Sequence, residues 1–326
     1  MSENSLRLPL LNAKNLLKLM ICPPRFVRFF VAAMCGFVSV VLSSPAVQAG
    51  DVETARALEG LGGKVTLKEN FVTEITFTDC SKIGAGEIKA IGELARLKSL
   101  TLYGKVKGLN DMTVDSLTGL HALESLSTEG AELSDAGLAR LADLKNLRKA
   151  SFFHLSFRKE GFTGKGFEAW KALAKLERLT VAGMSMGDDG FAAIATISSL
   201  QELSTWHTFQ TEAGNALIAK LPNLNTLKIG QRLPRAGAQG PSLSDASIPV
   251  FAGIKTLEAL KLGEGRFSYK ALAALKDLPK LKSLLIYEAD VSESDLEQLK
   301  TALPEVKIEF QPLTEEQRKK LEMYLK

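Results

Sequence analysis

Few residues of this 326-residue chain have side chains that could catalyse a reaction or hold a metal ion. The sequence contains 3 His and 3 Cys, and neither an H-x-x-E-H nor a C-x-x-C pattern occurs. Serine hydrolysis needs a histidine held beside a nucleophile, but His154 and His207 do not lie near a G-x-S-x-G turn. A zinc site needs several converging ligands. We therefore expect no catalytic residues, no metal site and no cofactor.

Binding is the chemistry that the sequence favours. Two aromatic residues each precede a histidine, in Phe153-His154 and Trp206-His207. Exposed aromatic side chains beside polar groups are the residue types that dominate the energetics of protein interfaces. The alternative is that Phe153 and Trp206 fold back over their own loops and belong to the core. Which alternative holds depends on the elements that carry these residues.

These elements repeat along the chain with the form L-x-x-L-x-L, as in Leu97–Leu102. Four of the nine spacings between successive copies equal 24 residues. The L-x-L part alternates as a β-strand does, and the preceding segment has an apolar residue every third position, which favours a short helix. The middle apolar residues of the ten copies are Ile75, Leu100, Leu126, Ala150, Leu179, Leu203, Leu227, Leu260, Leu284 and Val306.

Most of the expected helices begin with a residue that can cap them. A side-chain oxygen at this position accepts a hydrogen bond from a free backbone N–H of the first turn. Each unit is thus predicted to be one strand, one turn and one short helix, and stacked units bury a common core beneath a parallel sheet. The capping candidates are Asn110, Ser134, Thr163, Thr211, Ser244, Ser268 and Ser292.

These repeats resemble those of leucine-rich repeat proteins, and most closely the secreted bacterial members of the ribonuclease-inhibitor-like class. The resemblance covers residues 72–310. It implies an α/β right-handed solenoid, or horseshoe, with a parallel β-sheet on the concave face and short helices on the convex face. The family often has Asn three residues after the last strand leucine, whereas this chain has none there. Cys80 occupies that position, so we expect a buried structural thiol.

Shorter segments flank the repeats. Residues 50–71 are predicted to form an N-terminal cap, and residues 311–326 a C-terminal capping helix that covers the open edge of the last repeat. Thr314-Glu-Glu-Gln317 has the form of a capping box at the start of that helix. Two sealed ends indicate a monomer.

Residues 1–49 have the composition of a secretory signal peptide. Five basic residues precede the uncharged apolar stretch Phe29–Leu42, and Val47-Gln48-Ala49 puts small residues before a cut at Gly50. We therefore expect an exported protein that is periplasmic, secreted or on the cell surface. An uncleaved membrane anchor is the alternative, and Met20 is an alternative start to Met1.

Removal of this leader changes the charge of the chain. The full sequence has 41 Lys+Arg against 37 Asp+Glu, and the mature chain would keep 36 of each. A neutral chain gives no electrostatic reason to expect nucleic-acid binding. Cys22 and Cys35 would leave with the leader, so the mature chain could form no internal disulfide.

The expected binding surface combines outward strand positions with one rim of the sheet. Two basic insertions, at 157–165 and 231–241, follow strands on either side of Trp206, and insertions in solenoids often mark the binding face. The partner is expected to be an unidentified protein or envelope polymer. The candidate binding residues are Tyr103, Phe153, His154, Arg178, Trp206, His207, Lys228, Arg232 and Arg235.

The sequence thus predicts an exported, non-catalytic recognition module. One alternative is an exported polysaccharide hydrolase with a parallel β-helix, which would have three strands per turn and few helices. A second is a purely structural envelope component. Similar repeats also occur in substrate-recognition subunits of ubiquitin ligases, but no adaptor-binding helices precede the repeats here.

The leader can be tested directly. Mass spectrometry of the exported protein is expected to give a mature N-terminus at Gly50. Recovery of the intact Phe29–Ala49 segment in the membrane fraction would show instead that the leader is an anchor.

Overall fold

The computed structural model describes residues 49–157, 159–233 and 240–325. The described residues all fall in one compact unit of the chain, Val47–Lys326. The predicted leader at 1–49 lies outside the described residues except for Ala49.

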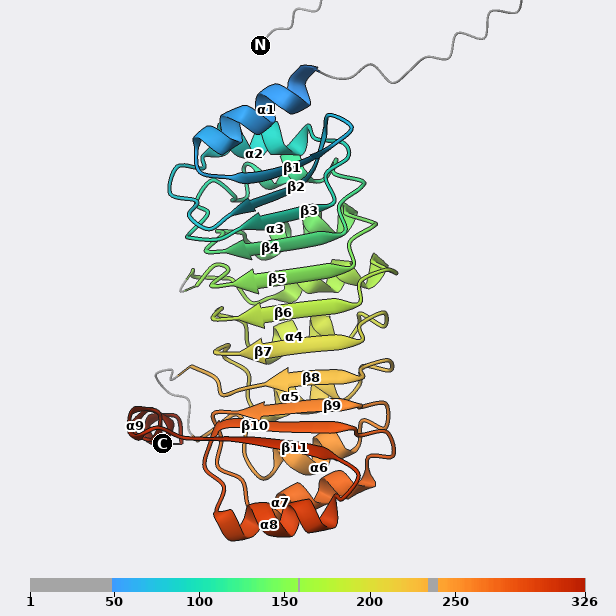
Figure 1. Cartoon of the computed structure of the whole chain (residues 1–326), viewed down its shortest axis with the longest axis vertical. Helices are drawn as coiled ribbons and strands as arrows, with labels where there is room; N and C mark the ends of the chain where they lie inside the picture. The colour runs from blue at the N-terminus through green and yellow to red at the C-terminus, as the bar shows by residue number, and fades with distance from the viewer. Residues whose placement is uncertain (1–48, 158, 234–239, 326) are drawn as a thin grey trace, which may run out of the picture. The chain divides into compact units, whose positions relative to one another are not determined.

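One sheet of 11 strands extends along this unit, with the strands in sequence order (Figure 1). The first pair is antiparallel, and every later strand pairs in parallel with its predecessor. The strands are β1 (Lys64–Lys68), β2 (Phe71–Phe77), β3 (Ser99–Leu102), β4 (Ser125–Glu129), β5 (Lys149–Phe153), β6 (Arg178–Ala182), β7 (Glu202–Trp206), β8 (Thr226–Ile229), β9 (Ala259–Gly263), β10 (Ser283–Ala289) and β11 (Lys307–Pro312).

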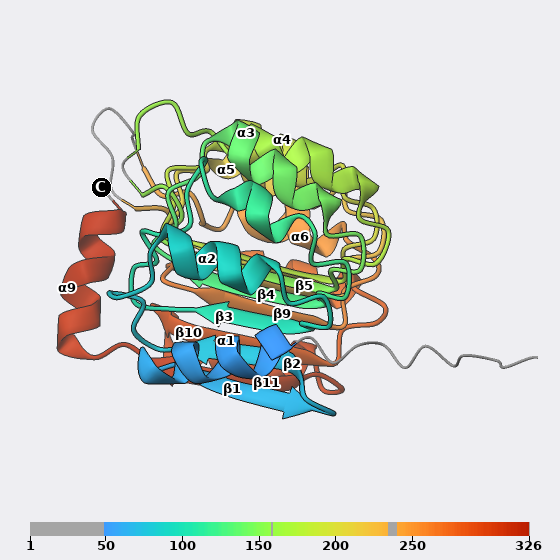
Figure 2. The same ribbon diagram turned by 90° about the horizontal axis from the view of Figure 1, so that it is seen from above.

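Short helices alternate with the strands, and Figure 2 shows α2 to α6 together on one side of the sheet. The α-helices are α1 (Ala49–Gly60), α2 (Ala85–Gly92), α3 (Asp135–Arg140), α4 (Asp188–Ile194), α5 (Glu212–Ile218), α6 (Ser247–Ala252), α7 (Tyr269–Leu272), α8 (Glu293–Ala302) and α9 (Glu315–Tyr324). The 3-10 helices are η1 (Val114–Leu117), η2 (Leu141–Asp143), η3 (Lys165–Ala172) and η4 (Ala273–Asp277). One strand and one helical segment per repeat confirm the predicted leucine-rich-repeat solenoid, and they exclude the β-helix.

Four helical segments are 3-10 helices, a type that the spacing of their apolar residues also suits. A 3-10 helix has three residues per turn, so apolar residues three apart lie on one face. Phe167 and Trp170 of η3 are three apart and fully buried, as is Leu173 after them. The repeat of three therefore fits these 3-10 helices as well as the α-helices of other repeats, such as α4, where Phe191 and Ile194 are also three apart and buried.

Equivalent residues of neighbouring repeats lie side by side in the sheet. Leu203 pairs with Leu179 on one side and Leu227 on the other, and all three are buried. The predicted register is wrong only in the last repeat, where Ile308 and not Val306 pairs with Leu284. Leu303-x-x-Val306 also has the form of the start of a repeat, but it lies two residues before the residues that pair in the sheet. A shift of two keeps the same face of the strand, so the inward positions are unaffected.

Four of the predicted helix caps form as expected. Ser134, Thr211, Ser268 and Ser292 each accept a hydrogen bond from a backbone N–H of the first turn. The other three candidates are wrong as helix caps, because they precede the cap position. The side-chain oxygen of each accepts a hydrogen bond from the backbone N–H of the residue two positions later. They are Asn110, Thr163 and Ser244.

Aspartates beside these caps connect consecutive repeats. Asp188 accepts hydrogen bonds from the backbone N–H and hydroxyl of Thr211 in the next repeat, at 2.8 and 2.6 Å. Asp188 also lies in the first turn of its own helix α4, so one carboxylate serves both the helix start and the contact between repeats. This carboxylate ladder supplies hydrogen bonds between repeats in a chain that has no asparagine ladder. The same bond pattern joins Asp135 to Thr163 and Asp245 to Ser268.

The two ends of the unit are built differently. α1 packs against β1 and β2 and buries Ala55 and Leu58. α9 begins with the predicted capping box of Thr314 and Gln317, but it lies beside the strand ends (Figure 1) and not across β11, which pairs only with β10. In the part of the chain that the structure describes, no helix is both long and apolar enough to span a bilayer.

Leu203→Ala tests the register of the sheet. Truncation of a fully buried leucine is expected to lower the free energy of unfolding by about 2–5 kcal/mol. Ser204→Ala, one residue further on the opposite face, is the matched control and is expected to change it by less than about 0.5 kcal/mol. Chemical denaturation measures both, and an unaltered transition for Leu203→Ala would contradict the register.

Candidate functional site

The residues that end successive strands form a line across the face of the sheet opposite the helices, which we call the open face. Three aromatic members of this line contact one another in turn: Tyr103 directly follows β3, Phe153 ends β5 and Trp206 ends β7. The ring centroids of Tyr103 and Phe153 are 5.8 Å apart, and those of Phe153 and Trp206 are 6.2 Å apart. All three side chains are half-buried, so they are not part of the core. We call these three residues the aromatic row.

A small residue lets two of these rings meet. Ala182 of β6 pairs with Phe153 on one side and with Trp206 on the other. It is only 3% exposed, although it lies on the open face. The two rings therefore cover Ala182 and form a continuous apolar surface above three strands.

Lys228 and Tyr287 extend the aromatic row toward the C-terminal repeats. The Lys228 ammonium nitrogen lies 4.3 Å from the centre of the Trp206 ring and 5.1 Å from that of Tyr287, which are distances for cation–π attraction. Burial lowers the pKa of Lys228, and the Lys261 cation lowers it further. Burial also raises the pKa of Tyr287, and nearby Glu264 raises it further.

The residue after each position of this line turns the chain out of the sheet, and in seven repeats it has a positive φ. Glycine adopts this left-handed conformation without strain, whereas other residues rarely do. Residues held in such conformations cluster at functional sites. The glycines are Gly104, Gly130 and Gly183, and the other residues are His154 (53°), His207 (54°), Glu264 (56°) and Glu288 (48°).

The two predicted histidines therefore lie at the rim, and each pairs with a glutamate. His207 Nε2 is 2.7 Å from Glu264 Oε1, and Lys320 Nζ of α9 is 3.8 Å from the same oxygen. His154 Nδ1 is 3.4 Å from Glu129 Oε1. Sequence reasoning missed both glutamates. Alignment of the repeats at their strands would have found Glu264, because it occupies the same repeat position as His207.

The predicted arginines do not join this site. Arg178 begins β6, at the opposite end of the strand from the row, and its Nε lies 3.0 Å from Glu202 Oε1. Arg232 is 9% exposed, and its guanidinium donates to the carbonyl oxygen of Gly240 at 2.5 Å. It therefore anchors the base of the second insertion and is not available on the surface. Arg235 lies outside the described residues.

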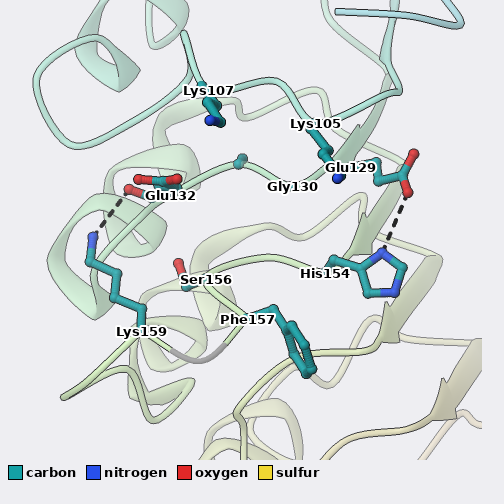
Figure 3. Close-up of a pocket in the computed structure, with 10 residues that line it drawn as sticks. Lys105, Lys107, Glu129, Gly130, Glu132, His154, Ser156, Phe157 and Lys159 are labelled. Atoms are coloured by element: carbon teal, nitrogen blue, oxygen red, sulfur yellow. Dashed lines mark hydrogen bonds and ion pairs between the residues drawn. The ribbon is translucent and has the colours of Figure 1, made fainter. Parts of the chain in front are cut away.

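A cavity of about 630 Å³ lies at the same rim, next to His154 (Figure 3). We call it the rim pocket. It is formed by the chain segments that follow β3, β4 and β5, and the first basic insertion supplies one side. The lining residues are Lys105, Lys107, Glu129, Gly130, Ala131, Glu132, His154, Ser156, Phe157 and Lys159.

Two comparisons with known proteins gave no match: neither a protein-family model nor a curated protein matches the chain. Among solved structures, an internalin (inlF) from Listeria monocytogenes is similar at a TM-score of 0.42 and 15% identity, over 85% of this chain and 94% of that one. An internalin C2 (inlC2) from the same species has a TM-score of 0.39 and 18% identity, over 77% of this chain and 89% of that one. The repeats and the parallel sheet of the chain itself give it the fold of a leucine-rich-repeat solenoid.

No group of three or more His, Cys, Asp or Glu side chains that could hold a metal ion occurs among the described residues. Cys80 is 1% exposed, as the predicted structural thiol should be. Burial, together with the nearby carboxylates of Asp79 and Glu129, raises its pKa to about 12. Because the thiolate is the reactive form, Cys80 is unsuited to nucleophilic chemistry at neutral pH.

Thiol reactivity tests this assignment. At pH 8 the native protein is expected to react with a disulfide reagent at least a hundredfold more slowly than the protein unfolded in guanidinium chloride, because the native thiol is both buried and protonated. The raised pKa also means that the folded state retains this proton up to higher pH than the unfolded state. Stability is therefore lost as pH rises from about 9 toward about 12. Rapid native labelling at pH 8 would contradict the assignment.

Proposed function

We propose that this protein is an exported, non-catalytic recognition module that binds an elongated partner, a protein segment or an envelope polymer, across the open face of its sheet. The observation that carries the proposal is the aromatic row of Tyr103, Phe153 and Trp206, whose contacting rings remain half-exposed. Half-exposed aromatic rings supply a large contact area that gains stability when a partner excludes water.

The row has the dimensions of a binding surface for an extended ligand. Tyr103 and Trp206 are four strands apart, from β3 to β7, which corresponds to about 19 Å at the usual strand spacing. Inclusion of Tyr287 on β10 lengthens the row to about 34 Å. A partner that lies across the strands could therefore contact every aromatic residue of the row.

The surroundings of the row favour contact with a partner over a role in the core. The outward residues of the neighbouring strands are small and hydroxylic, such as Ser127, Ser151 and Ser204, and they leave the rings as the most prominent features of the face. Lys228 adds one cation beside Trp206. This combination suits a partner with planar or apolar groups and a nearby negative charge.

Export is the second part of the proposal, and it rests on the sequence of the leader. The basic region, the apolar stretch Phe29–Leu42 and the small residues before Gly50 together support cleavage during secretion. A leucine-rich-repeat solenoid with a single buried thiol needs no disulfide to fold after export.

Paired variants test the proposed face. Three forms of the protein are immobilised and exposed to the culture or periplasmic fraction. They are the wild type, the double variant Phe153→Ala, Trp206→Ala, and the control Met112→Ala. Met112 is 89% exposed and is not part of the row. A retained partner is then titrated, and we expect the double variant to bind it at least 2 kcal/mol more weakly, with the control unchanged.

Circular dichroism and thermal melts of each variant show that the fold is intact. Equal binding by a folded double variant would contradict the proposed face. If no partner is retained by any form, the remaining reading is a purely structural component of the envelope.

A further inference from the structure

We propose that the rim pocket is a separate binding site for a carboxylate carried on a six-membered ring, a group that acidic sugars and aromatic acids share. The pocket has about 630 Å³, within the range of small-molecule sites. The proposal is independent of the function assigned to the open face, because it depends on other residues.

One wall of the pocket carries cations that no described carboxylate neutralises. Lys105 and Lys107 lie on this wall (Figure 3), and both are exposed. Over residues 49–157, 159–233 and 240–325, no ion pair involves either ammonium group. Lys159 differs, because its Nζ lies 3.5 Å from Asp111 Oδ2 and donates to the Glu132 carbonyl oxygen. Two ammonium groups are thus available to an anion.

The opposite wall is aromatic. Figure 3 shows Phe157 and His154 across the pocket from the two lysines. The Phe157 ring is 38% exposed, and it meets the His154 imidazole edge to face with centroids 6.0 Å apart. Aromatic faces bind other planar or C–H-bearing rings by stacking. A ligand that spans the pocket would therefore place its ring on Phe157 and its anionic group toward the lysines.

The acidic residues of the pocket are directed away from the two lysines. Glu129 Oε2 accepts the backbone N–H of Gly104 at 3.0 Å, and Oε1 faces His154. Glu129 is thus engaged with the rim on both of its oxygens. Among the described residues neither carboxylate forms an ion pair with Lys105 or Lys107, so both ammonium groups can approach the anionic group of a ligand.

The backbone of the pocket supports this assignment. Four lining residues have a positive φ: Lys105 (63°), Gly130 (72°), His154 (53°) and Ser156 (48°). A Cβ on Gly130 would lie 2.8 Å from Cα of Lys105, so the floor of the pocket is packed closely against the lysine wall. Strained non-glycine conformations persist where the surroundings hold them, and they concentrate at ligand sites.

Binding of defined probes tests the proposal. Galacturonate and benzoate are titrated into the full mature chain by NMR, with galactose and benzyl alcohol as neutral counterparts. We expect at least one acid to bind at least tenfold more tightly than its counterpart, and its affinity to fall as salt is added. Galacturonate and benzoate distinguish an acidic sugar from an aromatic acid.

Four variants locate the binding. The double variant Lys105→Gln, Lys107→Gln is expected to bind the acid about tenfold or more weakly than wild type. Phe157→Ala should also bind the acid more weakly. Lys270→Gln with Lys276→Gln, two exposed lysines on the helical side, is the matched control and should bind as wild type does. Trp206→Ala should retain the probe, which separates this site from the open face.

Three results would overturn the proposal. They are equal affinity for acid and neutral probes, unchanged affinity in the folded Lys105→Gln, Lys107→Gln variant, and no bound probe at millimolar concentration. Thermal melts of each variant establish that it is folded before the comparison is made.

Discussion

The structure depends on one constraint: equivalent residues of neighbouring repeats must pair side by side in a parallel sheet. Leu203 lies between Leu179 and Leu227 for this reason, and the same pairing aligns Phe153, Ala182 and Trp206 three residues further along the strands. A slip of one residue would turn Leu203 outward and bury Trp206. The core and the open face are therefore set by the same register, and neither can change without the other.

The ends of the strands follow from a second backbone requirement. The chain must leave the sheet abruptly after each strand, and a left-handed residue makes this turn. Glycine satisfies the requirement in three repeats, whereas His154, His207, Glu264 and Glu288 accept the strain in four others. Their side chains are carried to the rim, where histidines meet glutamates and where Lys320 attaches α9 to Glu264. A conformational need of the repeat thus concentrates polar side chains at one edge.

Much of the fold could be predicted because its period is strong. The L-x-x-L-x-L spacing predicted the strands and the outward positions. It gave the wrong register only in the last repeat, where Leu303-x-x-Val306 has the same form but lies two residues before the residues that pair. The helices were predicted, but their type was not, because a spacing of three suits both a short α-helix and a 3-10 helix.

The site was less predictable, for reasons that particular residues make clear. Sequence alternation predicts that a side chain points outward, but outward side chains occur at both ends of a strand. Arg178 was therefore grouped with the aromatic row, although it lies at the opposite end of its strand. Arg232 was expected on the surface, although the equivalent positions of two preceding repeats hold buried Leu155 and Met184. The pairing of His207 with Glu264 joins residues 57 apart across the second insertion. That insertion interrupts the period on which sequence reasoning depends.

The two surfaces proposed here meet at consecutive residues. Phe153 ends its strand with its ring on the open face, and His154 turns with a positive φ toward the rim pocket. A single backbone reversal therefore separates a face suited to an elongated partner from a cavity suited to a small anionic ring. Because Trp206 lies two strands from Phe153 while Lys105 and Lys107 follow β3, each surface keeps residues that the other does not touch. If both surfaces bind one polymer, an acidic ring of the polymer enters the pocket where the polymer crosses Phe153. The loss of binding free energy in a variant that lacks both surfaces then differs from the sum of the losses in the two separate variants, as expected for coupled sites.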